Sequence, residues 1–197
     1  MSIIPIDRKM RIQAKTPEMK IEFFTDDEIE RMKIFIQDKF KNENKRFKIH
    51  RRYFALLITL LRTGGRIDEV LELKPKDFDF QNNIVRLITL KKRKESYRNI
   101  PVHTELKTAI MEYLLEMHMD PRSDEKLFPM KRQSVDEYFK KMQNELGFRI
   151  HAHKFRHTFA VKAIMFGVPL NVFQKWLGHS SVFTTSNYNE ILVMHTK

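Results

Sequence analysis

The sequence predicts a mostly α-helical domain with a small antiparallel β-sheet, an α+β fold. Apolar residues recur at helical spacing in several segments of the 197-residue chain. Two short runs have the composition of strands, NIVRLITL and YRNIPV, and the basic turn KKRKES separates them. Because 42% of the residues are hydrophobic, and sixteen are phenylalanine, one domain of this length can bury a core.

The charge of the sequence indicates the class of partner. Lysine and arginine number 37 against 25 aspartate and glutamate, a formal net charge of +12. A folded domain with this excess favours a polyanion such as double-stranded DNA. The absence of cysteine excludes disulfides, thiolate zinc sites and cysteine nucleophiles. No apolar run approaches the roughly 20 residues of a membrane span, and a signal peptide is lacking, so we expect a cytoplasmic protein without a membrane partner.

The first elements follow a basic N-terminal arm or linker, predicted at residues 1–20. Residues 21–197 are predicted to form one folded domain. Thr25 and Glu28 have the spacing of a capping box at the start of a helix. The apolar residues of that helix recur at helical spacing: Ile29, Met32, Ile36 and Phe40.

Glycine and proline bound the next elements. A mostly buried helix is predicted in RRYFALLITLLRTGG, ending at Gly64 and Gly65. A short helix follows through Leu73, and Pro75 breaks the chain before the two strands.

Four helices are predicted after the strands, at about 104–118, 134–146, 153–166 and 169–177. Ser134 and Glu137 have the spacing of a second capping box, and Gly147 is a stop for that helix.

Three histidines and an arginine lie at the start of the helix at 153–166, in the stretch HAHKFRHTFA. One stripe of this helix is aromatic and predicted to belong to the core: Phe155, Phe159 and Phe166. His153, Arg156 and His157 point away from that stripe and could take part in chemistry, whereas His151 precedes the helix. His153 and His157 lie one turn apart, but the lack of a third ligand disfavours a metal site. A polar helix face without chemistry remains the alternative to an anion site.

Arg66 follows a glycine break and begins the next helix, in RTGGRIDEV. Unpaired backbone N–H groups at a helix start favour an anion, and a guanidinium can hold two phosphate oxygens. Glu69, three residues later, could orient that guanidinium. The alternative is an exposed surface pair of little energetic weight.

Two further stretches carry polar candidates. The basic turn contains Lys91, Arg93 and Lys94, which on their own predict a non-specific DNA contact. In LGHSSVFTTSNY, His179 follows a helix-ending glycine, where N–H groups of a following helix would be exposed. Tyr188 lies in a polar stretch, where a lone tyrosine is normally a surface residue.

Taken together and in this order, these residues resemble the catalytic domain of the tyrosine recombinases, the phage integrase family. The resemblance spans roughly residues 23 to 190. TGGRIDEVLEL is similar to the first arginine box of the family, and HKFRHTFA to its His-x-x-Arg box. LGHSSVFTTSNY is similar to the stretch with the second histidine and the nucleophilic tyrosine. The resemblance implies the recombinase catalytic-domain fold.

The resemblance also implies a mechanism. Arg66 and Arg156 would hold the non-bridging phosphate oxygens, because charge neutralisation at fixed geometry is the main task in phosphodiester cleavage. Tyr188 would attack phosphorus and leave a 3′-phosphotyrosyl link. His153 would act as base or oxygen ligand, and His179 would donate a hydrogen bond to the phosphate.

The leaving 5′-oxygen needs a proton, which in this family comes from a lysine of the β-turn. Counting back from the second strand favours Lys92, with Lys91 and Lys94 as rivals. His157 and Glu69 would be supporting residues. Because the covalent link stores the bond energy, rejoining would need neither ATP nor metal, and no cofactor is expected.

Two other functions remain open. The same chemistry could serve nicking and joining as in type IB topoisomerases, and basic charge alone would satisfy a non-catalytic DNA-binding module. The family implies a homotetramer on DNA, with room for an accessory DNA-bending protein. The short N-terminal arm fits either a compact member or a fragment. Gly65 departs from the family, which often has a larger apolar residue there.

Overall fold

The computed structural model describes residues 22–42, 46–90 and 96–178. Its elements in chain order are α1 (Asp26–Asn42), α2 (Phe47–Thr63), α3 (Ile67–Leu71), the 3-10 helix η2 (Pro75–Asp77), β1 (Phe78–Asp79), β2 (Ile84–Ile88), β3 (Tyr97–Pro101), α4 (Thr104–Met117), α5 (Arg132–Leu146), α6 (Ala152–Met165) and α7 (Leu170–Leu177). Helices dominate and one small sheet accompanies them, which confirms the predicted fold class. Over these three ranges, no helix combines the length and apolar character that a membrane span requires.

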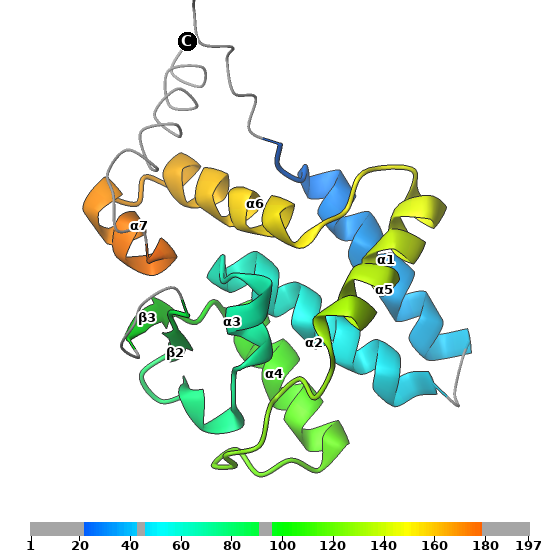
Figure 1. Cartoon of the computed structure of the whole chain (residues 1–197), viewed down its shortest axis with the longest axis horizontal. Helices are drawn as coiled ribbons and strands as arrows, with labels where there is room; N and C mark the ends of the chain where they lie inside the picture. Colours follow the sequence, from blue (N-terminus) through cyan, green and yellow to red (C-terminus); the bar gives the residue numbers. More distant parts are fainter. Residues whose placement is uncertain (1–21, 43–45, 91–95, 179–197) are drawn as a thin grey trace, which may run out of the picture.

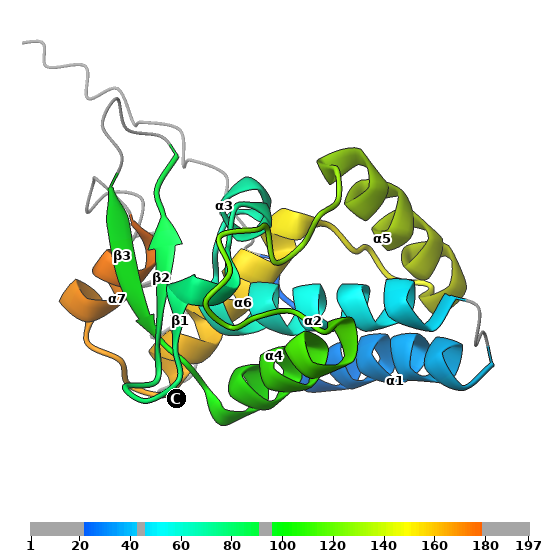
Figure 2. The same cartoon turned by 90° about the horizontal axis from the view of Figure 1, so that it is seen from below.

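Helix α2 lies at the centre of the fold. It packs against α1, α4 and α6, and Figure 2 shows α1 and α4 running alongside it. Its middle residues have no exposed surface, as expected for a helix that is apolar nearly all round: Ala55, Leu56, Leu57, Ile58 and Leu60. The helix ends where predicted, at Gly64, which has a left-handed φ of 59° and donates its N–H to the carbonyl of Leu60. The loop before Arg66 therefore begins directly at the end of the most buried helix.

The sheet is antiparallel with strand order β1-β2-β3. Val85 lies opposite Ile100, and Leu87 lies opposite Arg98. Because side chains alternate along a strand, Arg98 shares the inward face of β3 with Ile100 and is buried beside it. Strand β1 was not predicted, since two residues are too few for a visible alternation.

Helices α6 and α7 cover one side of the molecule (Figure 1). α6 packs against α2, and α7 packs against both α6 and β3. A small apolar cluster joins α6 to α7 and consists of Ala160, Ala163, Ile164, Phe173 and Leu177. This packing brings the end of α7 close to the hairpin of β2 and β3.

One predicted capping box is present and the other is wrong. The N–H of Thr25 donates to Glu28 Oε2 at 3.0 Å, and the N–H of Glu28 donates to Thr25 Oγ1 at 3.1 Å. Helix α5, by contrast, begins at Arg132, so Ser134 lies inside its first turn and donates its N–H to the carbonyl of Lys131. The helix starts before the serine because the carbonyl of Lys131 already accepts from the N–H groups of Ser134 and Val135.

The aromatic stripe of α6 is correct for two of its three members. Phe155 is fully buried, and Phe159 is partly buried beside Trp176, with ring centroids 6.3 Å apart. Phe166 is 84% exposed, so its assignment to the core was wrong. The helix ends at Met165 and the chain turns at Gly167, so helical periodicity no longer applies at Phe166.

Candidate active site

Arg66 occupies the N-cap position of α3, directly after the glycine pair. Its backbone N–H donates to Glu69 Oε2 at 2.9 Å, and its Nη1 donates to Glu69 Oε1 at 2.9 Å. Arg66 is 27% exposed and Glu69 has no exposed side-chain surface. The predicted pair therefore forms, but it is a half-buried support for a guanidinium and not an exposed surface pair.

Gly65 has a steric reason for lacking a side chain. A Cβ atom at this position would lie 2.8 Å from both Leu87 Cδ2 and Val70 Cγ2. Such distances are too short for carbon atoms, so a side chain at this position would have to displace buried methyl groups of β2 and α3. The close packing fixes the backbone that leads into Arg66.

Glu69 is shared by two arginines. Its Oε2 accepts a hydrogen bond from Arg98 Nη2 at 2.6 Å, while its Oε1 faces Arg66. Burial alone would raise the pKa of Glu69, but the hydrogen bond and charge of Arg98, followed by the hydrogen bonds from Arg66, lower it below its ordinary value. The carboxylate is therefore ionised at neutral pH and accepts from both guanidinium groups.

Arg156 was predicted to point away from the aromatic stripe and to be free for chemistry, but the structure buries it, with 3% of its surface exposed. Its Nη1 donates to the carbonyl of Gly64 at 2.8 Å, and its Nη2 donates to the carbonyl of Leu177 at 2.7 Å. These carbonyls compensate the burial of the charge. Arg156 thus lies against the loop that holds Arg66 and against the end of α7.

His153 and His157 lie on the same face of α6, one turn apart. Their ring centroids are 4.3 Å apart and the ring planes are nearly perpendicular, at 79°. Burial, with added repulsion from His153 and Arg156, lowers the pKa of His157 to about 4. His157 is therefore neutral at pH 7, with one donor and one acceptor nitrogen. His153 is exposed at the surface.

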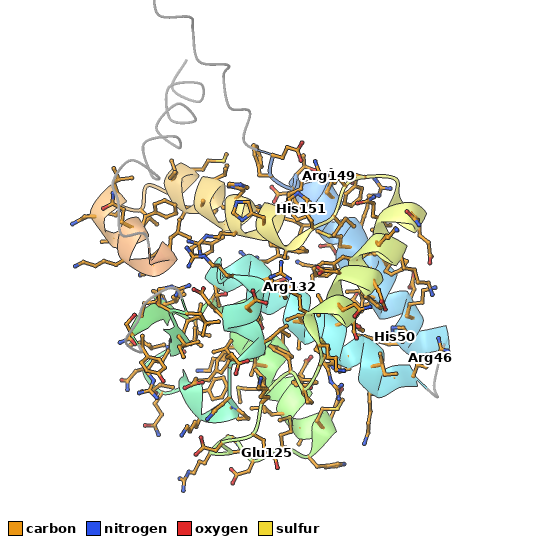
Figure 3. All side chains as sticks on the ribbon, viewed as in Figure 1. Arg46, His50, Glu125, Arg132, Arg149 and His151 are labelled. Atoms are coloured by element: carbon orange, nitrogen blue, oxygen red, sulfur yellow. The ribbon has the colours of Figure 1, made fainter. Side chains whose placement is uncertain are left out.

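Within the described residues, His153 and His157 lack the third ligand that a metal site would need. Across the described part of the chain, no three His, Cys, Asp or Glu side chains are grouped so that they could hold a metal ion. His151 occupies the N-cap position of α6 without a side-chain capping hydrogen bond, and it lies beside Arg149 at the edge of the molecule (Figure 3). Burial, then the charge of Arg149, lowers the pKa of His151.

Other predicted site residues lie outside the described residues: Lys91, Lys92, Arg93, Lys94, His179 and Tyr188. Their flanks are described. The N–H of Thr89 donates to the carbonyl of Ser96 at 2.7 Å, which joins the two strands at the base of the lysine-bearing turn. Gly178, with a left-handed φ of 64°, ends α7 just before His179. Both flanks lie near Arg98, which donates to Thr89 Oγ1 and to the carbonyl of Trp176.

Sequence reasoning missed two buried basic residues. Arg98 could have been noticed, because the alternation in YRNIPV puts it on the same face as the apolar Ile100. Lys154 lies between the candidate histidine and arginine of α6, and its Nζ is 3.5 Å from Glu28 Oε1 and 4.4 Å from the Phe24 ring centroid. No local pattern marks its charged partner, since Glu28 lies 126 residues away along the chain.

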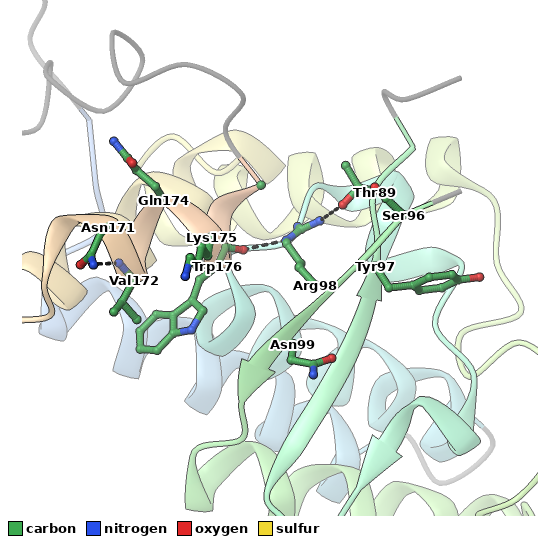
Figure 4. A pocket seen from close by; sticks show the side chains of 11 residues that line it. Thr89, Ser96, Tyr97, Arg98, Asn99, Asn171, Val172, Gln174, Lys175 and Trp176 are labelled. Atoms are coloured by element: carbon green, nitrogen blue, oxygen red, sulfur yellow. Dashed lines mark hydrogen bonds between the residues drawn. The ribbon is translucent and has the colours of Figure 1, made fainter. Parts of the chain in front are cut away.

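An open cleft of about 710 Å³ separates β3 from α7. Figure 4 shows Arg98 in this cleft, with its guanidinium between the last turn of α7 and the strand. Asn171, Lys175 and Trp176 line it from the α7 side. The cleft thus combines two basic side chains, Arg98 and Lys175, with polar and apolar ones, and it adjoins the flanks of the two undescribed segments that carry Lys92 and Tyr188.

The chain is similar in sequence to curated proteins that are named as recombinases. The chain is 30% identical to "Tyrosine recombinase XerA" of Saccharolobus solfataricus over 134 residues, an alignment that covers 68% of this chain and 44% of that protein. It is 30% identical to XerA of Pyrococcus furiosus, covering 76% of this chain and 53% of that protein. It is 33% identical to "Probable integrase/recombinase protein MJ0367" of Methanocaldococcus jannaschii, covering 68% and 44%. The chain thus spans about half the length of these relatives.

Solved structures show the same fold. The crystal structure of XerA recombinase matches with a TM-score of 0.66 and 25% identity, covering 88% of this chain and 64% of that one. The catalytic domain of bacteriophage HP1 integrase matches in fold with a TM-score of 0.62 and 20% identity, covering 90% and 92%. The model of the phage integrase family matches residues 22–195. That match covers more than half of the chain and includes Arg66 and Arg156, so the chain belongs to the phage integrase family.

Proposed function

We propose that this chain is a site-specific DNA recombinase that cleaves and rejoins DNA through a 3′-phosphotyrosyl intermediate, without metal or ATP. The observation that carries the proposal is the meeting of two arginines at one loop. Arg156 donates to the carbonyl of Gly64, two residues before Arg66. Two guanidinium groups held by separate helices are suited to neutralise the charge that grows around phosphorus.

The proposed nucleophile is Tyr188. A tyrosine has a pKa of about 10, so few molecules carry the phenolate at neutral pH, and the hydroxyl needs a base and a positive field. Tyr188 would attack phosphorus, expel the 5′-oxygen and remain bound to the 3′-phosphate. The reverse attack by a 5′-hydroxyl would restore the phosphodiester, and because no bond energy is lost, no nucleotide is consumed.

The histidines and a lysine would handle the protons. His153, exposed on α6, is the proposed base or oxygen ligand, and the neutral His157 beside it supports its ring. His179 would donate a hydrogen bond to the phosphate. Lys92, in the turn between β2 and β3, would protonate the leaving oxygen. Lys91, Arg93 and Lys94 would contact the DNA backbone.

The partners are proposed on the same basis. A net charge of +12 favours double-stranded DNA, and a related structure is titled XerH site-specific recombinase bound to difH substrate. A homotetramer on DNA, an accessory DNA-bending protein and a cytoplasmic location remain predictions. So does the division into an arm at 1–20 and a catalytic domain at 21–197.

Covalent trapping tests the proposal. The protein is incubated in EDTA with a nicked suicide substrate made from DNA flanking its gene, and a denaturant-resistant adduct is sought on a gel. Tyr188→Phe should abolish the adduct. Tyr97→Phe is the matched control, because Tyr97 is an exposed tyrosine on β3 and its loss should leave the adduct intact.

The other functions predict other outcomes. Relaxation of supercoiled DNA that lacks the target site would favour topoisomerase-like nicking and joining. Tight DNA binding without an adduct, also on the sites of relatives and with a longer chain, would leave a non-catalytic DNA-binding module. An adduct that persists in Tyr188→Phe would reject Tyr188 as nucleophile.

A further inference from the structure

Arg98 donates hydrogen bonds from all three of its guanidinium nitrogens. Its side chain is 7% exposed. Nη2 donates to Glu69 Oε2 at 2.6 Å, Nη1 to Thr89 Oγ1 at 3.0 Å and to the Ile88 carbonyl at 3.2 Å, and Nε to the Trp176 carbonyl at 2.7 Å. Strand β3 supplies the arginine, and its partners come from α3, from the end of β2 and from α7.

The first contact orients Arg66. Glu69 is buried, so its charge requires a partner inside the protein. Arg98 supplies that partner on Oε2 and leaves Oε1 to accept from Arg66. Without Arg98 the carboxylate could rotate or become protonated, and Arg66 would lose the group that fixes its direction.

The second contact fixes the end of α7. The last carbonyls of a helix have no partner within the helix. Arg98 satisfies that of Trp176, and Arg156 satisfies the next one, of Leu177. Arg98 also lies close to Gly178, where a Cβ atom would be 3.3 Å from its Cδ. The chain toward His179 therefore leaves α7 at a point that Arg98 helps to define.

The third contact holds the strand that enters the lysine turn. Arg98 Nη1 donates to the Ile88 carbonyl and to Thr89 Oγ1, at the end of β2. Thr89 in turn donates its N–H to the Ser96 carbonyl. These contacts fix both ends of the segment that carries Lys92.

We propose that Arg98 is a positioning residue, which holds Arg66, the base of the lysine turn and the end of α7 in one arrangement. This inference rests on the proposed function. Arg98 is not assigned to the phosphate itself, because each of its three guanidinium nitrogens donates to a protein group. It acts through the elements that bear the candidate catalytic groups.

The first test measures the rate of adduct formation at saturating DNA. Arg98→Met should lower this rate by about 100-fold, the order expected when reacting groups shift by about 1 Å, while the Kd for DNA changes little. Arg98→Lys keeps the charge but not the branched set of donors and should recover part of the rate. Arg51→Met is the matched control, since Arg51 is a similarly buried arginine that pairs with Glu112 and Glu116. Its rate should stay within about twofold of the wild type.

A double-mutant cycle with Glu69→Gln separates positioning from general damage. If Arg98 acts through Glu69, the double variant should lose less than the product of the two single losses. A loss equal to that product would overturn the link to Glu69. If Arg98→Met does not fold, the cycle is run with Arg98→Lys.

The fluorescence of Trp176, the single tryptophan of the chain, tests the α7 contact without DNA. Arg98→Met should increase quenching by acrylamide, because the end of α7 loses a backbone contact, and Arg51→Met should not. Unchanged quenching together with an unchanged rate would overturn the proposal. If the wild type forms no adduct, the proposed function fails and Arg98 has no role in cleavage, while quenching still decides whether Arg98 holds α7.

Discussion

Two carboxylates in this protein are each held between two cations, and they differ in burial. Glu69 accepts from Arg66 and Arg98 and has no exposed side-chain surface. Glu105, on α4, has a side chain that is 27% exposed. Its Oε1 lies 2.5 Å from Lys33 Nζ, and its Oε2 lies 2.5 Å from Arg62 Nη2. In both cases burial would raise the pKa, and the paired cations lower it below the ordinary value.

The difference in burial decides what each cluster can do. Water can solvate Glu105 or its cations if one partner is lost, so that cluster contributes modestly to stability. Water cannot replace a lost partner of the buried Glu69, so the position of its carboxylate depends on both arginines. A buried carboxylate is therefore suited to hold a functional guanidinium in place, and a partly exposed one to join two helices.

Removal of Glu69 should have the largest effect. Glu69→Ala leaves Arg98 buried without its charged partner and should lower the free energy of unfolding by about 3 to 5 kcal/mol. Urea unfolding followed by circular dichroism measures the loss. A loss below about 1 kcal/mol would mean that water reaches Arg98 and that the cluster behaves like an exposed pair.

Removal of Glu105 should cost less. Glu105→Ala takes charged hydrogen bonds from Lys33 and Arg62, but both cations regain water, so we expect a loss of about 1 to 2 kcal/mol. The same urea titration measures it. A cost equal to that of Glu69→Ala would break the comparison.

Acid should act on the carboxylates and on His157 in different pH windows. The pKa of both glutamates is lowered from 4.5, so their stabilisation is present above about pH 4.5 and is lost as the pH falls further. The pKa of His157 is about 4, below its ordinary 6.5, so stability already falls between these values as the unfolded chain takes up a proton.

Unfolding titrations at several pH values check this prediction. His157→Gln should flatten the dependence between about pH 6.5 and 4, and Glu69→Ala should flatten it only below about 4.5. A His157→Gln variant with the wild-type profile would show that the ring is solvated in the folded state.

Salt should give the smallest effect. In 1 M NaCl the Debye length is about 3 Å, so the cost of Glu105→Ala should shrink by about 0.5 kcal/mol. The cost of Glu69→Ala should not change, because ions do not enter the buried cluster. Urea titrations with and without salt give both numbers, and an equal salt effect on the two variants would contradict the assigned burial.

The sequence predicted the elements well because each one depends on local spacing. The apolar stripe of α1, the glycine after α2 and the strand runs around the basic turn all appear in the structure. The sequence did not predict burial that depends on partners distant along the chain. Arg156 is buried because the carbonyls of Gly64 and Leu177, 92 and 21 residues away, accept its N–H groups. A polar side chain gives no periodic sign of such partners.

Motifs in the sequence predicted the candidate catalytic residues, but they did not predict Arg98, which helps to hold Arg66 in place through Glu69. Arg66 and Glu69 lie three residues apart, so their contact could be expected from spacing. Arg98 lies 29 residues from Glu69, and only the fold brings them together. The register that places Arg98 opposite Leu87 is a property of the sheet and not of either strand alone.

Because Glu69 accepts hydrogen bonds from both Arg66 and Arg98, few mutational paths at this site avoid a buried unpaired charge. A mutation of Arg98 alone, or of Glu69 alone, passes through an intermediate with an unmatched charge inside the protein. Homologues that lack the Glu69–Arg98 pair should therefore have both residues replaced. Lys33 and Arg62, by contrast, can be substituted one at a time around Glu105. Columns 69 and 98 of a family alignment should vary together.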